Sequence, residues 1–283
     1  MQKDKIAPAL RFAFRLTAKI KLVILTLMNI LLTVFNIAVL VMFCTGLVCF
    51  IALFFIPAGY GKMIDKKWGF SFNNKAAWFI MEAPALIAMT AVLCLRAGSG
   101  IVKIIIASFY MLHYAQRTLI FPFLLKGKSK MPLSIVLMGF VFNTINAALI
   151  GLWIFYLSPD DLYTVLWLRD PRFIAGAAIF FAGMIINIDS DKYIRSLRKQ
   201  GSSAHFFPKN RMYRYVSSAN YFGEILEWCG FALLSWSLAG VLFAFWTAAN
   251  LVPRAYAINK KYKETFPEEF AALKPKCIFP FIF

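Results

Sequence analysis

Long apolar runs separated by short clusters of charged residues dominate this chain. The first run extends from Leu22 to Pro57 without a charged residue. Four more follow at about residues 76–95, 102–125, 131–157 and 172–188. A helix needs roughly 20 mostly apolar residues to cross a bilayer, and residues 215–253 hold enough for two helices, with a break at Ser235-Trp236-Ser237. The pattern predicts an all-α integral membrane protein with seven transmembrane helices, a count that hydropathy alone leaves open by one. We expect the first run to form a single long helix, since two crossings would be tight.

Composition excludes a water-soluble globule. Of 283 residues, 61% are apolar and 16% charged, with a mean hydropathy of +0.69, whereas soluble domains average about 45–50% and about 25%. Six basic residues alternate with apolar ones in residues 1–21, as in a helix that lies on a membrane surface. We therefore expect this N-terminal segment to precede one membrane domain, residues 22–283.

The net charge of +18 resides in the segments between apolar runs, where anionic headgroups or phosphate-bearing ligands are better partners than nucleic acid. In a seven-helix arrangement, one side of the membrane receives 20 basic residues, in 58–75, 126–130, 189–214 and the tail. The opposite side receives 10. Because basic loops stay in the cytoplasm, we expect a cytoplasmic C-terminus, in an endoplasmic-reticulum-type or bacterial inner membrane.

The five cysteines form no CxxC pair and have no zinc-site spacing. They lie mostly in apolar runs, so we read them as packing residues and expect neither a metal site nor a disulfide framework.

Four ionisable residues fall inside or beside apolar spans, where a charge is costly and function is the default interpretation. They are Glu82, Arg117, Glu224 and Glu227. A carboxyl group in hydrocarbon keeps its proton and can donate a hydrogen bond to a carbonyl oxygen, which is the role we expect for Glu82. The alternative is a structural ion pair between Glu82 and Arg117 or Lys75.

Tyr114 precedes Arg117 by three residues, a spacing that shares a helix face. A guanidinium nearby would make the phenol a stronger donor toward a developing oxyanion. The alternative is a tyrosine and an arginine that reach the headgroups at the membrane interface.

Two further faces indicate a polar ligand. Spacings of four, four and three residues align Asn187, Asp191, Arg195 and Arg198, which suits sugar hydroxyls at one end and phosphates at the other. A salt-bridged cytoplasmic helix would have the same pattern. Asn220, Glu224 and Glu227 share a second face. Glycine-rich nucleotide motifs are absent, so a nucleotide would bind among helices.

These motifs together resemble the steroid 5α-reductase family (3-oxo-5α-steroid 4-dehydrogenases), from about Gly59 to the end. The most specific blocks are Ile186-Asn187-Ile188-Asp189-Ser190-Asp191 and Asn220-Tyr221-Phe222-Gly223-Glu224, supported by Glu82 and Tyr114. The resemblance implies helices that enclose a cofactor and substrate cavity, with substrate-side helices in residues 22–157 and an NADPH-binding half in residues 172–283. It also implies reduction of the Δ4 double bond of an apolar 3-oxo-Δ4-steroid that enters from the membrane lipid.

The resemblance implies a role for each candidate residue. Glu82 and Tyr114 would hydrogen-bond the substrate carbonyl, while Trp78 and Phe142 would line the pocket. The residues implied to hold NADPH are Tyr60, Lys62, Arg117, Asn187, Asp191, Arg195, Arg198, Asn220, Glu224, Arg254 and Tyr262.

Departures from the family pattern leave the substrate open. Met81 stands where a glutamine often precedes the catalytic glutamate, and Met138 where an arginine is usual before Gly139. A reductase of polyprenals or long-chain enoyl thioesters is an alternative, and a transporter with an intramembrane ion path is another. The oligomeric state is not indicated, and a monomer is compatible with the sequence.

Overall fold

The computed structural model describes residues 3–56, 69–96, 98–126, 129–197 and 206–283, with side chains from Lys19 onward. It divides into two units, residues 1–41 and residues 42–283. Helix α1 (Lys3–Phe55) forms the described part of the first unit and continues into the second. The prediction of one helix for the first apolar run is therefore confirmed, and the helix passes residue 21 without a break.

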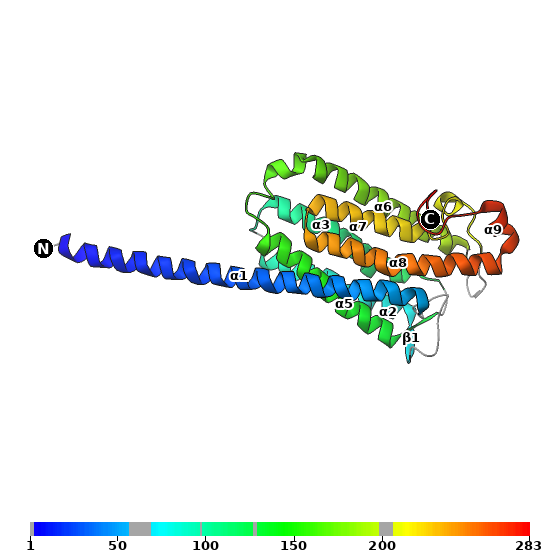
Figure 1. Cartoon of the computed structure of the whole chain (residues 1–283), viewed down its shortest axis with the longest axis horizontal. Helices are drawn as coiled ribbons and strands as arrows, with labels where there is room; N and C mark the ends of the chain where they lie inside the picture. Colours follow the sequence, from blue (N-terminus) through cyan, green and yellow to red (C-terminus); the bar gives the residue numbers. More distant parts are fainter. Residues whose placement is uncertain (1–2, 57–68, 97, 127–128, 198–205) are drawn as a thin grey trace. The chain divides into compact units, whose positions relative to one another are not determined.

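The second unit is a bundle of long helices (Figure 1). They are the last part of α1, α2 (Asn74–Leu95), α3 (Ile101–Ala115), α5 (Leu133–Leu152), α6 (Pro171–Leu197), α7 (Ala219–Ser235) and α8 (Leu238–Thr265). Helix α2 packs on α5, and α7 packs between α6 and α8. Within this unit the Trp246 indole donates to the Met42 carbonyl at 2.9 Å and so joins α8 to α1.

Shorter elements connect or extend these helices. They are η3 (Gln116–Ile120), α4 (Phe121–Leu124), η4 (Trp153–Leu157), η5 (Val165–Arg169), η6 (Arg211–Arg214) and α9 (Pro267–Leu273). Segments η3 and η4 are π-helical turns, a geometry found mostly as single turns at functional sites.

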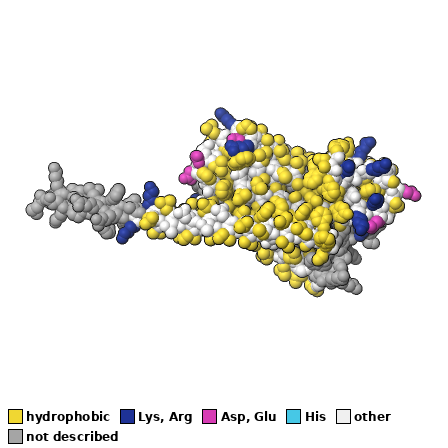
Figure 2. Space-filling model, in the orientation of Figure 1, with side chains coloured by type: hydrophobic (Ala, Val, Ile, Leu, Met, Phe, Trp, Pro, Cys, Tyr) yellow, Lys and Arg dark blue, Asp and Glu magenta, His cyan; other side chains and the backbone are white. Residues whose placement is uncertain are grey.

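Five described helices are long and apolar enough to cross a membrane: Lys19–Phe55, Asn74–Leu95, Leu133–Leu157, Pro171–Leu197 and Leu238–Thr265. Figure 2 shows apolar side chains over the middle of the second unit, with Lys, Arg, Asp and Glu gathered toward its two ends. The chain is therefore a multi-pass, all-α membrane protein. Helices α3 and α7, with 15 and 17 residues, are not among the five, so seven spans stay a prediction.

Two helices extend beyond the apolar runs. Helix α6 continues past residue 188 to Leu197, in agreement with the helical face that aligns Asn187, Asp191 and Arg195, and Asp191 accepts from Asn220 of α7. Helix α8 continues past Pro253 to Thr265.

A small β-pair was not predicted. Strands β1 (Ser71–Asn73) and β2 (Lys130–Pro132) pair antiparallel, just before α2 and α5 respectively. The Asn73 side chain then accepts from the backbone N–H of Lys75 at 2.8 Å and caps α2. The pair fixes the starting points of the two helices that later contribute Glu82 and Asn143.

Four glycines let α6 and α7 touch backbone to backbone. They are Gly176 and Gly183 on α6, and Gly223 and Gly230 on α7. A Cβ atom on Gly183 would lie 2.6 Å from the Gly223 carbonyl oxygen, and one on Gly230 would lie 2.6 Å from that of Gly176. Such close approach between helices is typical of small residues in membranes. It brings the polar ends of α6 and α7 side by side.

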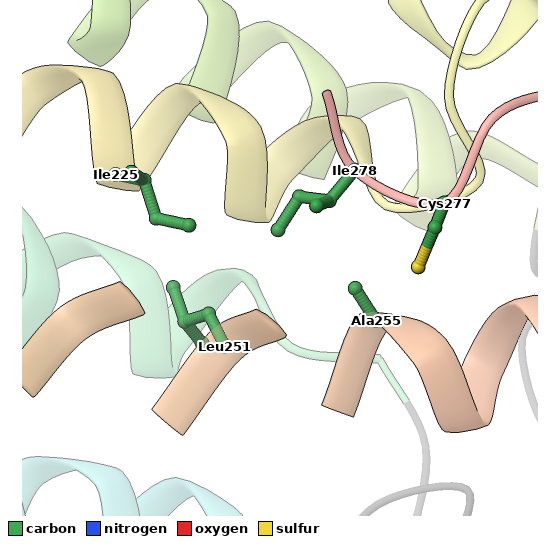
Figure 3. Close-up of a cluster of buried hydrophobic side chains, with 5 residues drawn as sticks. All are labelled: Ile225, Leu251, Ala255, Cys277 and Ile278. Atoms are coloured by element: carbon green, nitrogen blue, oxygen red, sulfur yellow. The ribbon is translucent and has the colours of Figure 1, made fainter. Parts of the chain in front are cut away.

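The C-terminal tail packs against α7 and α8. Figure 3 shows Cys277 and Ile278 of the tail directed between Ile225 of α7 and the α8 residues Leu251 and Ala255. The tail also pairs with the chain before α7, where the backbone N–H of Ser217 donates to the Lys276 carbonyl at 2.8 Å. It therefore braces the segment that leads into α7.

At the opposite end of the bundle, the loop after α5 covers the end of α7. The Tyr163 hydroxyl donates to the Ser235 carbonyl, and the Trp167 indole donates to the Leu234 carbonyl at 3.0 Å. Burial raises the pKa of Tyr163, so its hydroxyl stays protonated and remains a donor. These bonds satisfy carbonyls that the helix itself leaves without partners.

We expect Tyr163→Phe to destabilise the protein by about 1–3 kcal/mol, because it leaves the buried Ser235 carbonyl without this donor. Thermal unfolding in detergent, followed by circular dichroism, measures the change. Tyr156→Phe is the matched control, because Tyr156 lies in the same region with 36% of its surface exposed. Equal effects of the two substitutions would show that the Tyr163 bond contributes nothing specific.

Candidate active site

A buried hydrogen-bonded trio joins three helices in the middle of the bundle. The Tyr114 hydroxyl on α3 donates to Oδ1 of Asn143 on α5 at 2.9 Å. The Asn143 amide nitrogen in turn donates to Oε2 of Glu82 on α2 at 3.2 Å. The exposed fractions of Glu82, Tyr114 and Asn143 are only 8%, 2% and 5%. The two residues predicted to bind a carbonyl are thus linked through a third.

The ion pairs considered for Glu82 are not found. Lys75 is exposed at the start of α2, and Arg117 pairs with carboxylates from other helices. Glu82 is therefore a buried carboxyl whose hydrogen-bond partner in the described structure is the neutral amide of Asn143.

The polar surface continues one helical turn away. Asn146 lies three residues after Asn143 and donates to the Tyr110 hydroxyl at 3.4 Å. The Tyr110 and Tyr114 rings pack with centroids 4.6 Å apart. Two asparagines of α5 thus face two tyrosines of α3.

His113 and Glu227 form a second buried contact, with Nδ1 and Oε1 2.8 Å apart. Both are almost fully enclosed, with 5% and 1% of their surface exposed. The other carboxylate oxygen of Glu227 has no hydrogen-bond partner among the described residues. His113 directly precedes Tyr114 of the trio, and Glu227 lies on α7.

A further cluster surrounds Arg117, which η3 contributes. Its guanidinium lies 3.3 Å from Glu224 of α7 and 3.5 Å from Asp191 of α6. Asn220 donates to Asp191 at 3.0 Å, and Asn187 donates to the Asn220 carbonyl at 2.9 Å and to Glu224 at 3.3 Å. The structure therefore brings together five of the predicted cofactor residues: Arg117, Asn187, Asp191, Asn220 and Glu224. Arg195 adds a longer ion pair, 4.0 Å from Asp191.

The π-helical turn gives Tyr114 and Arg117 different surroundings. Tyr114 precedes the turn and bonds Asn143 on the α5 side, whereas Arg117 lies within it and pairs toward α6 and α7. In a regular α-helix, two residues three positions apart lie on the same face. The π-turn holds more residues per turn, so it changes which face Arg117 occupies relative to Tyr114. The guanidinium also lies over the rings of Trp78, at 5.1 Å, and Phe121, at 4.6 Å.

A neighbouring tyrosine orients Asn220. Burial raises the pKa of Tyr213 well above its usual range, so the Tyr213 hydroxyl stays protonated and donates to Asn220 Oδ1 at 3.2 Å. The Asn220 amide nitrogen is thereby directed toward Asp191.

Several buried polar atoms around this cluster have no hydrogen-bond partner among the described residues. They are the hydroxyl oxygens of Thr118, Ser190 and Ser218, and Nη1 of Arg195. Each follows or closely precedes a member of the cluster along the chain. Buried polar groups normally have partners, so these atoms indicate a site for a polar ligand.

The remaining predicted residues lie elsewhere or outside the described part. Phe142 packs on Phe243 and Trp246, with ring centroids 6.0 and 5.0 Å apart. Arg254 donates to the Tyr221 hydroxyl at 2.6 Å, and Tyr262 packs on the Phe207 ring. Tyr60, Lys62 and Arg198 lie outside the described residues. Within the described ranges, no group of three His, Cys, Asp or Glu side chains could hold a metal ion.

The fold and the site define a multi-pass membrane protein with a buried polar network contributed by several of its helices. A family profile described as 3-oxo-5-alpha-steroid 4-dehydrogenase matches residues 129–283. The 3-oxo-5-alpha-steroid 4-dehydrogenase 1 of Bos taurus is 39% identical over 243 residues, which cover 84% of this chain and 92% of the relative. The human protein of the same name is 40% identical over 215 residues, covering 74% and 80%.

A plant relative matches a larger share of this chain. The steroid 5-alpha-reductase DET2 of Gossypium hirsutum is 33% identical over 259 residues, covering 89% of this chain and 98% of the relative. The chain therefore belongs to the 3-oxo-5-alpha-steroid 4-dehydrogenase family, a family of oxidoreductases, as the resemblance predicted.

Sequence reasoning missed Asn143, Asn146 and Tyr110. A signal was present, since two asparagines three residues apart in an apolar run share a helix face. A search for ionisable residues inside apolar runs passes over this pair, although a neutral amide in hydrocarbon also requires a partner.

Proposed function

We propose that this protein uses NADPH to reduce the Δ4 double bond of 3-oxo-Δ4-steroids, giving 5α-3-oxosteroids. The observation that carries the proposal is the buried trio of Glu82, Asn143 and Tyr114 beside the Arg117 cluster. Relatives named 3-oxo-5-alpha-steroid 4-dehydrogenase and steroid 5-alpha-reductase support the substrate class.

Glu82 is the proposed acid that binds the substrate carbonyl. Ionising a carboxyl among apolar side chains costs free energy, and its partner Asn143 supplies no compensating charge. Glu82 in its protonated form can donate a hydrogen bond to the ketone. A donor that is already in place, in a site with little water, stabilises the charge that develops on the carbonyl oxygen. Trp78 and Phe142 are the proposed apolar contacts of the steroid.

The residues around Arg117 fit a dinucleotide. Ribose hydroxyls need both donors and acceptors, which Asn187, Asp191 and Asn220 provide, and the unpartnered hydroxyls of Ser190 and Ser218 lie next to them in sequence. Nη1 of Arg195 lies 4.0 Å from Asp191 and makes no hydrogen bond with the described residues, so it can donate to a phosphate oxygen. When bound, NADPH would supply the hydride that adds to the β-carbon of the enone, and a proton that adds to the α-carbon afterwards would complete the reduction.

The full proposed set of cofactor-binding residues keeps the sequence prediction: Tyr60, Lys62, Arg117, Asn187, Asp191, Arg195, Arg198, Asn220, Glu224, Arg254 and Tyr262. Arg117 has a particular part, because it pairs with Asp191 and Glu224 while its guanidinium lies on Trp78. It thereby ties the proposed cofactor side of the bundle to the proposed substrate side.

The membrane arrangement follows the same proposal. Helix α3 continues through η3 and α4 as residues 101–124, which gives it the length of a sixth span, and α7 supplies the seventh. The end of the bundle with β1, η6 and α9 carries the loops richest in Lys and Arg, so we place it in the cytoplasm. The membrane lipid delivers the steroid.

The test is product analysis with purified protein in detergent, supplied with NADPH and a panel of a 3-oxo-Δ4-steroid, a polyprenal and a long-chain enoyl thioester. Of the three substrates, we expect only the steroid to give NADPH oxidation and a 5α-reduced product. Asp191→Asn should raise the KM for NADPH and change the steroid KM little. Reduction of the polyprenal or thioester instead would replace the proposed substrate, and no NADPH oxidation with any member would refute the proposed function.

A further inference from the structure

The Asn143 amide makes three hydrogen bonds, two within the trio and one to the backbone of α2. Its amide nitrogen donates to the backbone carbonyl of Met81 at 2.8 Å and to Glu82 Oε2 at 3.2 Å, while its Oδ1 accepts from the Tyr114 hydroxyl at 2.9 Å. A primary amide has two N–H donors, so both are engaged. The side chain, with 5% of its surface exposed, is held in a single orientation.

The Met81 carbonyl determines that orientation. A backbone carbonyl can only accept a hydrogen bond, so the amide nitrogen must face Met81, and Oδ1 must then face Tyr114. With the amide reversed, two acceptors would meet at Met81. The arrangement therefore follows from the backbone of α2.

The orientation of Asn143 also determines which oxygen of Glu82 carries the proton. Oε2 accepts from the Asn143 amide, so it is the carbonyl-type oxygen of a protonated carboxyl group. Among the described residues, the hydrogen bond to Glu82 falls on Oε2, so Oε1 is the oxygen that carries the proton and can donate a hydrogen bond to a ligand.

The same orientation of Asn143 also determines the direction of the Tyr114 hydroxyl. Since Oδ1 of Asn143 is an acceptor, the single Tyr114 proton points to Asn143. The Tyr114 hydroxyl can donate a hydrogen bond to a ketone only when it gives up its hydrogen bond to Asn143.

We propose that Asn143 is a positioning residue for the reaction, because it fixes which oxygen of Glu82 donates to the substrate carbonyl and which way the Tyr114 hydroxyl points. The inference rests on the proposed function, and it adds a residue whose role there is to orient others. Glu82 is then the main donor and Tyr114 the secondary one.

The first experiment compares Asn143→Leu with the wild-type enzyme, using steady-state kinetics with NADPH and a 3-oxo-Δ4-steroid. We expect kcat to fall about 10- to 100-fold, because a misplaced catalytic group costs that much, while the KM for NADPH changes by less than about threefold. Asn143→Asp, which keeps an oxygen for Tyr114 and loses the amide donors, should lie between Asn143→Leu and wild type.

Asn146→Leu is the matched control. Asn146 is an equally buried asparagine on the same face of α5, and it bonds Tyr110 rather than Glu82 or Tyr114. We expect its kcat to stay within about threefold of wild type, even if thermal unfolding shows that both leucine variants lose similar stability. Equal losses of kcat in the two variants would overturn the proposal, as would wild-type kcat in Asn143→Leu.

A second readout is independent of turnover. Difference infrared spectroscopy of a steroid with a ¹³C-labelled 3-oxo group reports hydrogen bonds to the bound carbonyl. We expect the wild-type shift of the carbonyl stretch to be reduced in Asn143→Leu and retained in Asn146→Leu. An unchanged shift in Asn143→Leu refutes the positioning role. If instead Glu82→Gln leaves both the shift and kcat unchanged, the carbonyl-binding function of the site fails as well.

Discussion

Glu82→Gln lowers kcat for the reduction of a 3-oxo-Δ4-steroid about 100-fold, since a positioned acid contributes about 10²–10⁴-fold in such reactions. The amide of glutamine is isosteric with the carboxyl group and can still accept from Asn143, so the fold is retained. It is a weaker donor than a carboxylic acid and stabilises the developing oxyanion less. Steady-state assays of NADPH oxidation measure the loss, and Glu82→Leu should lose more.

Tyr114→Phe should lose less than Glu82→Gln, about tenfold, because the Tyr114 proton is engaged by Asn143. Glu264→Gln is the matched control, because Glu264 is exposed in the last turn of α8, and we expect no change in kcat. Glu82→Gln with wild-type kcat would remove Glu82 from the mechanism.

The second large effect concerns the fold itself. Gly183→Leu should abolish the folded protein, and Gly183→Ala should destabilise it by about 1–3 kcal/mol, the usual cost of overpacking. An added Cβ would lie 2.6 Å from the Gly223 carbonyl oxygen, and a backbone atom cannot rotate away. Separating α6 from α7 would also separate Asn187 and Asp191 from Asn220. Monodispersity and thermal unfolding in detergent report the result.

Gly151→Ala provides the comparison for this glycine. Gly151 is buried in α5, but its nearest neighbour would be a Val92 methyl group at 3.4 Å, an ordinary contact with a side chain. Alanine favours a helix over glycine by about 0.8–1 kcal/mol, so Gly151→Ala should be neutral or stabilising. If Gly183→Ala behaves in the same way, the close contact between α6 and α7 does not limit stability.

The apolar pattern was sufficient to predict most of the fold. Each run longer than about 20 residues became a helix, and the break near Trp236 separates α7 from α8, where Trp236 has a φ of 43°. The pattern failed where polar residues enter the bundle. The apolar run of α6 ends near residue 188, and only the spacing of its polar residues indicates that the helix continues. Asn187 and Asp191 have partners on α7 and η3. Strands of three residues, such as β1, are too short to leave a periodic signal.

The candidate site was only partly accessible from sequence. Charge inside an apolar span identified Glu82, Arg117, Glu224 and Glu227. Which of these pair with one another depends on how α2, α3, α6 and α7 are rotated, and the π-turn at Gln116–Ile120 changes the direction of Arg117 in a way that spacing alone does not reveal. The neutral Asn143 joins the site only once α5 is placed beside α2.

The most direct test measures where the hydrogen transferred from NADPH is found in the product. Wild-type protein is given NADPH deuterated at the transferable position of the nicotinamide and a 3-oxo-Δ4-steroid, and the product is analysed by mass spectrometry and NMR. We predict a single deuterium at C5, the β-carbon of the enone, in a 5α product. A reduced steroid without deuterium at C5, or no reduction at all, would contradict the account.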